Sequence, residues 1–267
     1  MPFVTIASHR IEYERIETTR VGRPELVFLH EGLGSMSMWR DFPGRVARAT
    51  GCGAVVASRH GYGQSDPLAA PRTVRYMHDE ALTALPEFLG ALSIEHPILV
   101  GHSDGGSIAL ILAGAGIIPL TAVVTLAAHV LVEDLTVASI AAAKTAFETT
   151  DLRTKLARHH ADVDSAFLGW NRIWLAPEFR GWNIEEYLPT IRCPVLAIQG
   201  EDDEYGTMEQ MECLRAGVAD IELVQLDACG HSPHRDRPDA VIDAMVRFVD
   251  RVTGQSTGQP LSGNQSP

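Results

Sequence analysis

The stretch ILVGHSDGGSIALILAG, residues 98–114, decides the fold. It begins with a short apolar run typical of a buried strand and ends with apolar residues at helical spacing. Between the two lies GHSDG, residues 101–105, which has the pattern G-x-S-x-G. A serine on so tight a strand-to-helix turn projects its hydroxyl above the sheet, and the glycines leave room for the crowded backbone. The stretch therefore predicts that Ser103 is a nucleophile at the carboxyl end of a buried strand.

A serine hydroxyl is a weak nucleophile at neutral pH, so it needs a base that is itself held by a third group. The segments QGEDD, residues 199–203, and CGH, residues 229–231, each follow an apolar strand pattern. Open α/β sheets place their sites at the carboxyl ends of the strands. We therefore assign His231 as the general base and an acidic residue of 201–203 as the carboxylate that orients it.

Short apolar runs rich in β-branched residues alternate with helical patterns along the chain. Such alternation predicts a parallel sheet that is covered by helices on both faces. An antiparallel hairpin precedes it at the sheet edge, which makes about eight strands in all. The predicted strands are residues 4–6, 10–16, 26–29, 54–57, 98–100, 122–126, 195–198 and 221–226. The predicted helices are residues 77–92, 103–114 and 238–253.

The interval between the predicted strands at 122–126 and 195–198 is too long for a simple crossover. It shows helical spacing and then a series of large aromatic residues. We interpret residues 133–189 as a helical lid inserted into a core made of residues 1–132 and 190–253. The polar sequence that follows predicts a disordered tail over residues 254–267.

Composition excludes several classes of partner. The formal net charge is −12, from 22 Lys and Arg against 34 Asp and Glu, which repels nucleic acids and anionic membranes. No stretch approaches the roughly 18 apolar residues of a membrane helix, and the first residues lack the features of a secretory signal. Four scattered cysteines without a CxxC pair argue against a zinc or dithiol site. We predict a cytoplasmic monomer or homodimer with a small-molecule substrate, no metal and no cofactor.

From about Glu25 to Val252 the chain resembles small capped α/β-hydrolases of the esterase, enol-lactonase and proline iminopeptidase kind. HEGLG, residues 30–34, resembles the oxyanion loop of that family, and GYGQS, residues 61–65, resembles its glycine turn. The serine, the acid and the histidine also follow the chain order of that family. The resemblance implies an α/β-hydrolase fold with a mostly parallel sheet and a helical lid. It places the acid three positions after the glycine at 200, which favours Asp203 over Asp202.

Glu31 departs from that pattern, because the family usually has glycine directly after the histidine of the loop. A carboxylate beside a forming oxyanion would oppose it, since an oxyanion hole presents hydrogen-bond donors to negative charge. We therefore expect Glu31 to turn away and to pair with Arg40, Arg59 or a histidine.

The remaining site residues are predicted from their places along the chain. The oxyanion donors are expected to be the N–H of Asp104 and that of Gly32 or Leu33. Trp170, Trp174 and Trp182 of the lid are expected to wall the substrate pocket, although large rings also dominate the packing of cores. We expect His129 to face the substrate and His102 to be a packed residue. The histidines expected at the surface are His159, His160 and His234.

The resemblance implies hydrolysis of a small carboxylic ester or lactone through an acyl-enzyme. Serine at position 103 disfavours haloalkane dehalogenases and epoxide hydrolases, which need aspartate there. One alternative is a carbon–carbon bond hydrolase or lyase that uses the same triad on an anionic diketone, and the arginines of the lid leave it open. Another is a ligand-sensing relative with slow turnover, in which the triad serves to close the lid on a signal molecule.

Overall fold

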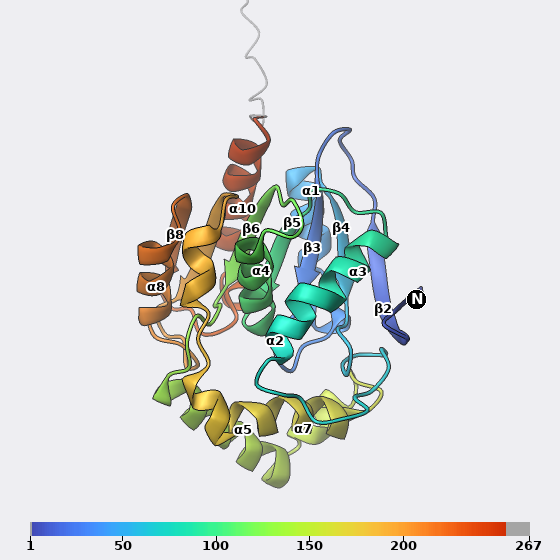
Figure 1. The fold of residues 1–267 in the computed structure, drawn as a ribbon, viewed down its shortest axis with the longest axis vertical. Helices are drawn as coiled ribbons and strands as arrows, with labels where there is room; N and C mark the ends of the chain where they lie inside the picture. The colour runs from blue at the N-terminus through green and yellow to red at the C-terminus, as the bar shows by residue number, and fades with distance from the viewer. Residues whose placement is uncertain (1, 255–267) are drawn as a thin grey trace, which may run out of the picture.

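The computed structural model describes residues 2–254 of the 267-residue chain. A central sheet lies between two layers of helices, and a further group of helices lies beyond one end of the strands (Figure 1). Apart from Gly254, the tail predicted over residues 254–267 lies outside the described residues. Within residues 2–254, no helix is long and apolar enough to cross a membrane.

The sheet has eight strands in the order β1-β2-β4-β3-β5-β6-β7-β8. The pairs β1–β2 and β2–β4 are antiparallel, and every other neighbouring pair is parallel. The predicted mixed sheet with an edge hairpin is confirmed. The strands are β1 (Phe3–Ile6), β2 (His9–Ile16), β3 (Glu25–Leu29), β4 (Gly53–Ala57), β5 (Ile98–His102), β6 (Ala122–Leu126), β7 (Val195–Gly200) and β8 (Ile221–Leu226).

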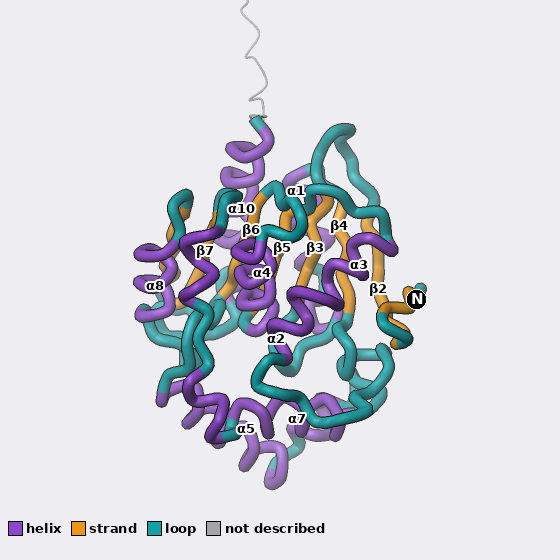
Figure 2. The backbone as a smooth tube through the Cα atoms, viewed as in Figure 1, coloured by secondary structure: helices purple, strands orange, loops and turns teal. Residues whose placement is uncertain are grey.

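Helices cover both faces of the sheet, as Figure 2 shows, and each layer buries its own hydrophobic cluster. On one face lie α1 (Phe42–Thr50) and α10 (Pro238–Thr253), whose apolar residues join those of the strands in a single cluster. The other face is covered by α2 (Tyr76–Asp79), η2 (Glu80–Ala84), α3 (Leu85–Ala91), α4 (Asp104–Ala115) and α8 (Glu209–Gly217). Two short elements, η1 (Met36–Trp39) and α9 (Pro233–Asp236), lie in the loops.

The helix predicted over residues 77–92 is present, but it is not a regular α-helix. Its middle part, η2, is a π-helix that leads into α3. Pro86, in the first turn of α3, has no N–H to donate, and its ring would clash with a carbonyl one turn earlier. A wider π turn before the proline relieves this clash. Two further helices, α1 and α8, had not been predicted.

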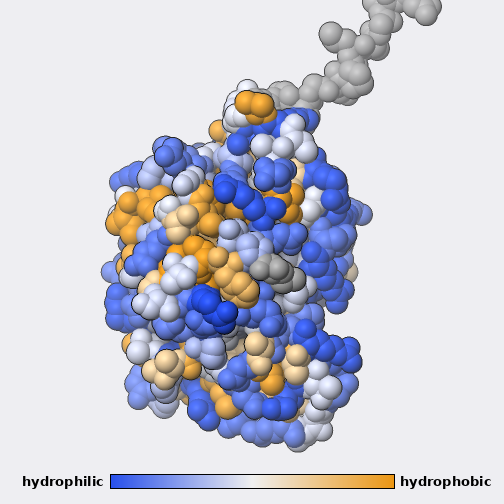
Figure 3. All heavy atoms as spheres, turned by 90° about the vertical axis from the view of Figure 1, so that its right-hand side faces the viewer, coloured by the Kyte–Doolittle hydropathy of each residue, from blue (hydrophilic) through white to orange (hydrophobic). Residues whose placement is uncertain are grey.

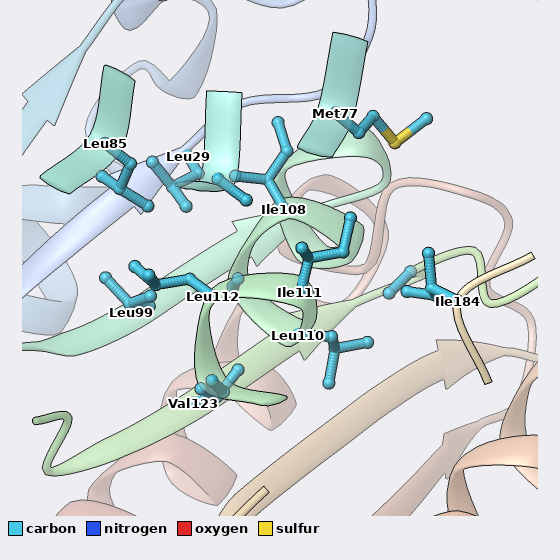
Figure 4. Close-up of a cluster of buried hydrophobic side chains, with 14 of the residues drawn as sticks. Leu29, Met77, Leu85, Leu99, Ile108, Leu110, Ile111, Leu112, Val123 and Ile184 are labelled. Atoms are coloured by element: carbon cyan, nitrogen blue, oxygen red, sulfur yellow. The ribbon is translucent and has the colours of Figure 1, made fainter. Parts of the chain in front are cut away.

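Helix α4 carries the nucleophile candidate at its start and is buried along almost its whole length. Residues 104–113 are all buried, as expected for a helix that is apolar on every side. In Figure 4, Ile108 lies near Leu29 of β3, and Leu112 lies near Leu99 of the sheet. This close packing gives the start of α4 a rigid base.

The chain between β6 and β7 forms the helices α5 (Asp134–Thr149), α6 (Leu152–Leu156), α7 (Val163–Trp174), η3 (Pro177–Gly181) and η4 (Glu185–Thr190). We call residues 134–190 the inserted segment. In Figure 1, α5 and α7 lie beyond the ends of the strands, away from the body of the sheet. Helix α7 begins at a regular cap, because Asp162 accepts a hydrogen bond of 2.8 Å from the N–H of Ser165.

Two glycines allow α4 to approach the sheet. A Cβ atom at Gly101 would overlap the carbonyl oxygen of Gly105, and a Cβ at Gly105 would overlap the carbonyl oxygen of Leu29. Both obstacles are backbone atoms of packed elements, so neither can move aside cheaply. The spacing of glycines around the serine therefore has a steric cause.

We expect Gly105→Ala to lower the free energy of unfolding by about 1–3 kcal/mol, because the new methyl group must displace backbone of β3. Gly90→Ala is the matched control, since a Cβ at Gly90 meets open space in helix α3. That change should raise stability by about 0.5–1 kcal/mol. Urea denaturation followed by circular dichroism measures both. Equal effects of the two substitutions would show that the approach of α4 to β3 is not tight.

Candidate active site

Ser103 connects β5 to α4 in a strained backbone conformation. Its φ of 52° and ψ of −118° lie outside the regions that residues with side chains normally adopt. The turn is held on both sides. The N–H of Ser103 donates to the carbonyl of Leu126 at 2.9 Å, and its own carbonyl accepts from the N–H of Gly106 at 2.8 Å. The serine is thus fixed at the carboxyl ends of β5 and β6.

His231 and Asp203 come from the loops that follow β8 and β7. The Nδ1 atom of His231 lies 2.8 Å and 3.0 Å from the two carboxylate oxygens of Asp203. The N–H groups of Tyr205 and Gly206 also donate to Asp203, at 2.8 Å and 3.1 Å. Burial raises the pKa of Asp203, but His231 and the N–H of Tyr205 outweigh it and hold the pKa below its ordinary value. Asp203 contacts the histidine, whereas Asp202 is exposed.

Ser103 and His231 line one cavity of about 110 Å³. The other predicted site residues that line it are Gly32, Leu33, Asp104, His129, Trp170 and Trp174. Trp182 does not line this cavity. It packs inside the inserted segment, with ring centroids 6.2 Å from Trp174 and 5.5 Å from Phe179.

Sequence reasoning missed several residues of this cavity. Tyr205 lines it, and its ring centroid lies 4.7 Å from that of His231. Its position two residues after the acid was the only signal in the sequence. Thr136 and Ile140 reach the cavity from α5, and helical spacing alone could not show which side of that helix faces the serine.

Two backbone segments can present N–H groups to the cavity. Asp104 is the first residue of α4, so its N–H has no acceptor within the helix. The start of a helix also carries partial positive charge. Gly32 and Leu33 approach from the loop after β3, and a Cβ at Gly32 would overlap the indole of Trp170. Glycine at 32 therefore lets Trp170 lie directly on the loop.

The alpha/beta hydrolase family model matches residues 26–244 of this chain. The chain belongs to the alpha/beta hydrolase family. Solved structures agree with the predicted fold class, which is confirmed. The hydrolase MGS-M2 from a Medee basin deep-sea metagenome library has a TM-score of 0.74 and 19% identity, with 97% of this chain and 100% of that chain covered.

Two further solved structures are similar at the same level. The proline iminopeptidase of Mycobacterium smegmatis has a TM-score of 0.73 and 18% identity, with 94% of this chain and 98% of that chain covered. The esterase EaEST from Exiguobacterium antarcticum has a TM-score of 0.73 and 19% identity, with 93% and 98% covered. A sequence search of curated proteins found no match.

Glu31 of this alpha/beta hydrolase is paired, as expected, with a histidine. Its carboxylate lies 3.3 Å from Nδ1 of His102 and 3.5 Å from the guanidinium of Arg235. The other ring nitrogen of His102 lies 2.7 Å from the carbonyl oxygen of His231. Burial raises the pKa of Glu31, but His102 and Arg235 outweigh it, and the pKa is held well below its ordinary value. Through His102, the carboxylate of Glu31 is thereby connected to the backbone of the loop that carries His231.

The carboxylate of Asp104, directly after the nucleophile, is held by a second group of side chains. The hydroxyl of Tyr76 donates to it at 2.6 Å, and the indole N–H of Trp174 donates to that hydroxyl at 3.0 Å. Arg59 lies 3.8 Å from the same carboxylate. Burial raises the pKa of Asp104 against the opposing effect of Arg59 and Tyr76. The sequence had drawn attention only to the N–H of this residue.

Two histidines expected at the surface are buried, so that prediction is wrong for His160 and His234. His160 accepts from the N–H of Gly63 at 3.0 Å and donates to the carbonyl of Leu33 at 3.1 Å. His234 packs against Trp39, with ring centroids 4.7 Å apart. His129 faces the cavity as predicted, and burial lowers its pKa to about 3, so its ring is neutral at pH 7.

Glu31→Gln should lower the stability of this hydrolase at pH 7 by about 1–3 kcal/mol, because it removes a charged partner of His102 and Arg235. Since folding lowers the pKa of Glu31, its contribution is complete above about 4.5, the ordinary value, and is lost as the pH falls below it. The difference between wild type and variant should therefore shrink at acid pH. Urea denaturation from pH 7 to pH 3.5 measures this difference, with Glu14→Gln, an exposed residue of β2, as the control. A difference that stays constant with pH would contradict this pairing.

Proposed function

We propose that this alpha/beta hydrolase is a serine hydrolase that cleaves a small carboxylic ester or lactone through an acyl-enzyme intermediate. One observation carries the proposal: Ser103, on its strained turn, lines the same cavity as His231, whose Nδ1 lies 2.8 Å from the buried carboxylate of Asp203. A nucleophile, a base and a group that orients the base are the three parts that acyl transfer by serine requires.

In the proposed reaction, Nδ1–H of His231 donates to Asp203, which leaves the Nε2 lone pair to take the proton of the Ser103 hydroxyl. Oγ then bonds to the carbonyl carbon of the substrate. The N–H groups of Asp104 and of Gly32 or Leu33 stabilise the negative oxygen that forms. When the carbon–oxygen bond to the alcohol breaks, His231 returns the proton to the leaving oxygen. Water attacks the acyl-enzyme by the same route and releases the acid.

The size and walls of the cavity support a small, mostly apolar substrate. Its volume of about 110 Å³ is well below the roughly 300–1,000 Å³ of typical sites for drug-sized ligands. Trp170 and Trp174 of α7 and Ile140 of α5 form apolar walls. We further propose that residues 133–189 act as a lid on a core of residues 1–132 and 190–253, so that the segment over Ser103 determines substrate size.

Carbon–carbon bond hydrolysis of an anionic diketone is the second candidate, and it would need positive charge at the cavity. The arginines of the inserted segment do not supply it. Arg153 pairs with Asp164, and Arg180 pairs with Asp134, on the exposed outer side. Neither of these, nor Arg158 or Arg172, is among the residues that line the cavity in the described part of the chain. This distribution favours a neutral ester or lactone.

A ligand-sensing relative differs from an enzyme in turnover. Release of many equivalents of product per protein molecule from an aryl ester would exclude a ligand-sensing role.

A cytoplasmic location and a monomeric or homodimeric state belong to the proposal as well. The four free cysteines support a cytoplasmic location.

Ser103→Ala should keep the fold and reduce turnover of aryl esters by about 10³-fold or more, because the hydroxyl forms the covalent bond. Labelling by a fluorophosphonate, read by intact mass, should be lost as well. Ser107→Ala is the matched control. Ser107 is also buried, on the next turn of α4, where it donates to the carbonyl of His129 at 2.6 Å, and its loss should leave labelling intact. Labelling of Ser103→Ala would refute the assignment.

The acid and the base have a matched test of their own. His231→Ala should reduce turnover about as much as Ser103→Ala, since the three residues act as one unit. Asp203→Asn should reduce it somewhat less, and Asp202→Asn should have little effect, because only Asp203 contacts His231. The ratio kcat/KM for an aryl ester measures all three variants. A larger loss with Asp202→Asn would overturn the assignment of the acid.

Trp170→Ala should shift the preference among aryl esters towards longer acyl chains, because it removes a ring from the wall of the cavity. Trp182→Ala is the control, since the two rings are 6% and 7% exposed but only Trp170 lines the cavity. Both changes should reduce stability by about 3–5 kcal/mol if the rings are fully enclosed. Only Trp170→Ala should change the ratio of kcat/KM values for hexanoate and acetate esters. An equal change in both variants would mean that the insertion acts on specificity through its stability alone.

A further inference from the structure

A second pocket, larger than the catalytic cavity, lies beside the edge hairpin. Its volume is about 510 Å³, and it is enclosed by β1 and β2, by η2 and α3, and by the loop of residues 67–73. None of its lining residues lines the catalytic cavity. Figure 3 looks onto the side of the molecule that carries β2 and α3, where hydrophobic residues lie among hydrophilic ones.

The walls of this hairpin pocket are apolar. Ile6 and Ile11 come from the hairpin, Leu85 and Phe88 from α3, and Ile108 from α4, and all five are buried. Figure 4 shows Leu85 and Ile108 on either side of Leu29, which also lines the pocket. Such walls favour a hydrocarbon part of a ligand.

Two buried arginines give the pocket a polar part. The side chains of Arg59 and Arg72 are 6% and 5% exposed, and both residues line the pocket. Among the described residues, Nε and one terminal nitrogen of Arg59 and Nε of Arg72 have no hydrogen-bond partner. Buried N–H groups in proteins are nearly always paired, so an unpaired set on two guanidinium groups indicates room for an oxygen ligand.

The acids that the structure describes near these arginines leave several of the guanidinium N–H donors without a hydrogen-bond partner. Glu80 lies 3.5 Å from Arg72 and 3.8 Å from Arg59, which makes it a shared and distant partner. Asp104 lies 3.8 Å from Arg59 and already accepts from Tyr76. The N–H groups of Arg59 and Arg72 that have no partner among the described residues are therefore available to an oxygen ligand.

We propose that the hairpin pocket binds an amphipathic organic monocarboxylate, with its carboxylate on Arg59 and Arg72 and its hydrocarbon chain between the hairpin and α3. A guanidinium presents a planar fork of donors that matches a carboxylate. The bound molecule is separated from Ser103, because Tyr76 of this pocket and Asp104 of the catalytic cavity meet in a hydrogen bond of 2.6 Å between them. The hairpin pocket is thus a binding site separate from the one at which the proposed reaction takes place.

Isothermal titration calorimetry with sodium octanoate and octan-1-ol tests the charge requirement. The wild-type protein is titrated before and after its active serine is labelled with a fluorophosphonate. Octanoate should bind at one site in both forms, and octan-1-ol should bind at least about tenfold more weakly, because charged hydrogen bonds are the stronger ones. Equal binding of the two compounds, or no binding of octanoate, would overturn the proposal. Loss of octanoate binding on labelling would overturn it too, since octanoate would then occupy the catalytic cavity.

Two variants test the place of binding. Arg72→Met removes one guanidinium, and Ala84→Phe adds a ring to the pocket from η2 and leaves both arginines in the sequence. Each should weaken octanoate binding about tenfold or more. Arg153→Met, an exposed arginine paired with Asp164, is the matched control and should bind as wild type does. If Arg72→Met does not fold, Ala84→Phe decides alone, and wild-type affinity in that variant overturns the proposal. A failure of labelling counts against Ser103 as the nucleophile and leaves the Ala84→Phe result to decide on the pocket.

Discussion

The close approach of α4 to the backbone of β3 and β5 is the constraint on which the rest of the site depends. It exists because glycines at 101 and 105 leave no side chain between the elements, and it forces the positive φ of Ser103. The start of α4 then lies beside the loop after β3 and beside the strand ends that carry the acid and the histidine. A larger distance between α4 and these strands would separate the serine from the N–H groups that face the same cavity.

This arrangement places two carboxylates next to a position where negative charge is proposed to develop. Each one is held by its own partners: Glu31 by His102 and Arg235, and Asp104 by Tyr76 and Arg59. Arg59 also contacts the segment of Glu31, because it donates to the backbone carbonyl of that residue at 3.2 Å. The carboxylate that stands in place of the family's glycine is thus paired by side chains from two other segments, His102 of β5 and Arg235 of α9.

The sequence was sufficient for the elements whose signals are local. The parallel strands are mostly apolar runs, the hairpin strand β2 alternates apolar and charged residues, and the elbow, the acid and the histidine follow strands. Its failures concern residues whose surroundings are set by distant parts of the chain. His160 is buried only because Gly63 and Leu33 come to meet it, and Trp182 packs against its neighbours instead of the cavity. Helix α1 was not predicted, because its first turn contains Pro43 and Gly44, which disfavour the interior of a helix.

The contacts of His160 have a mechanical consequence. This residue, just before α7, is clamped to the glycine turn through Gly63 and to the loop after β3 through the carbonyl of Leu33. The next residue, Ala161, also donates to the carbonyl of Gly63 at 2.8 Å. These hydrogen bonds hold the start of α7 in place. A movement of the inserted segment would therefore either rotate about this point or displace Leu33. A displacement at the start of α7 would reach the loop that lines the cavity through the ring of His160.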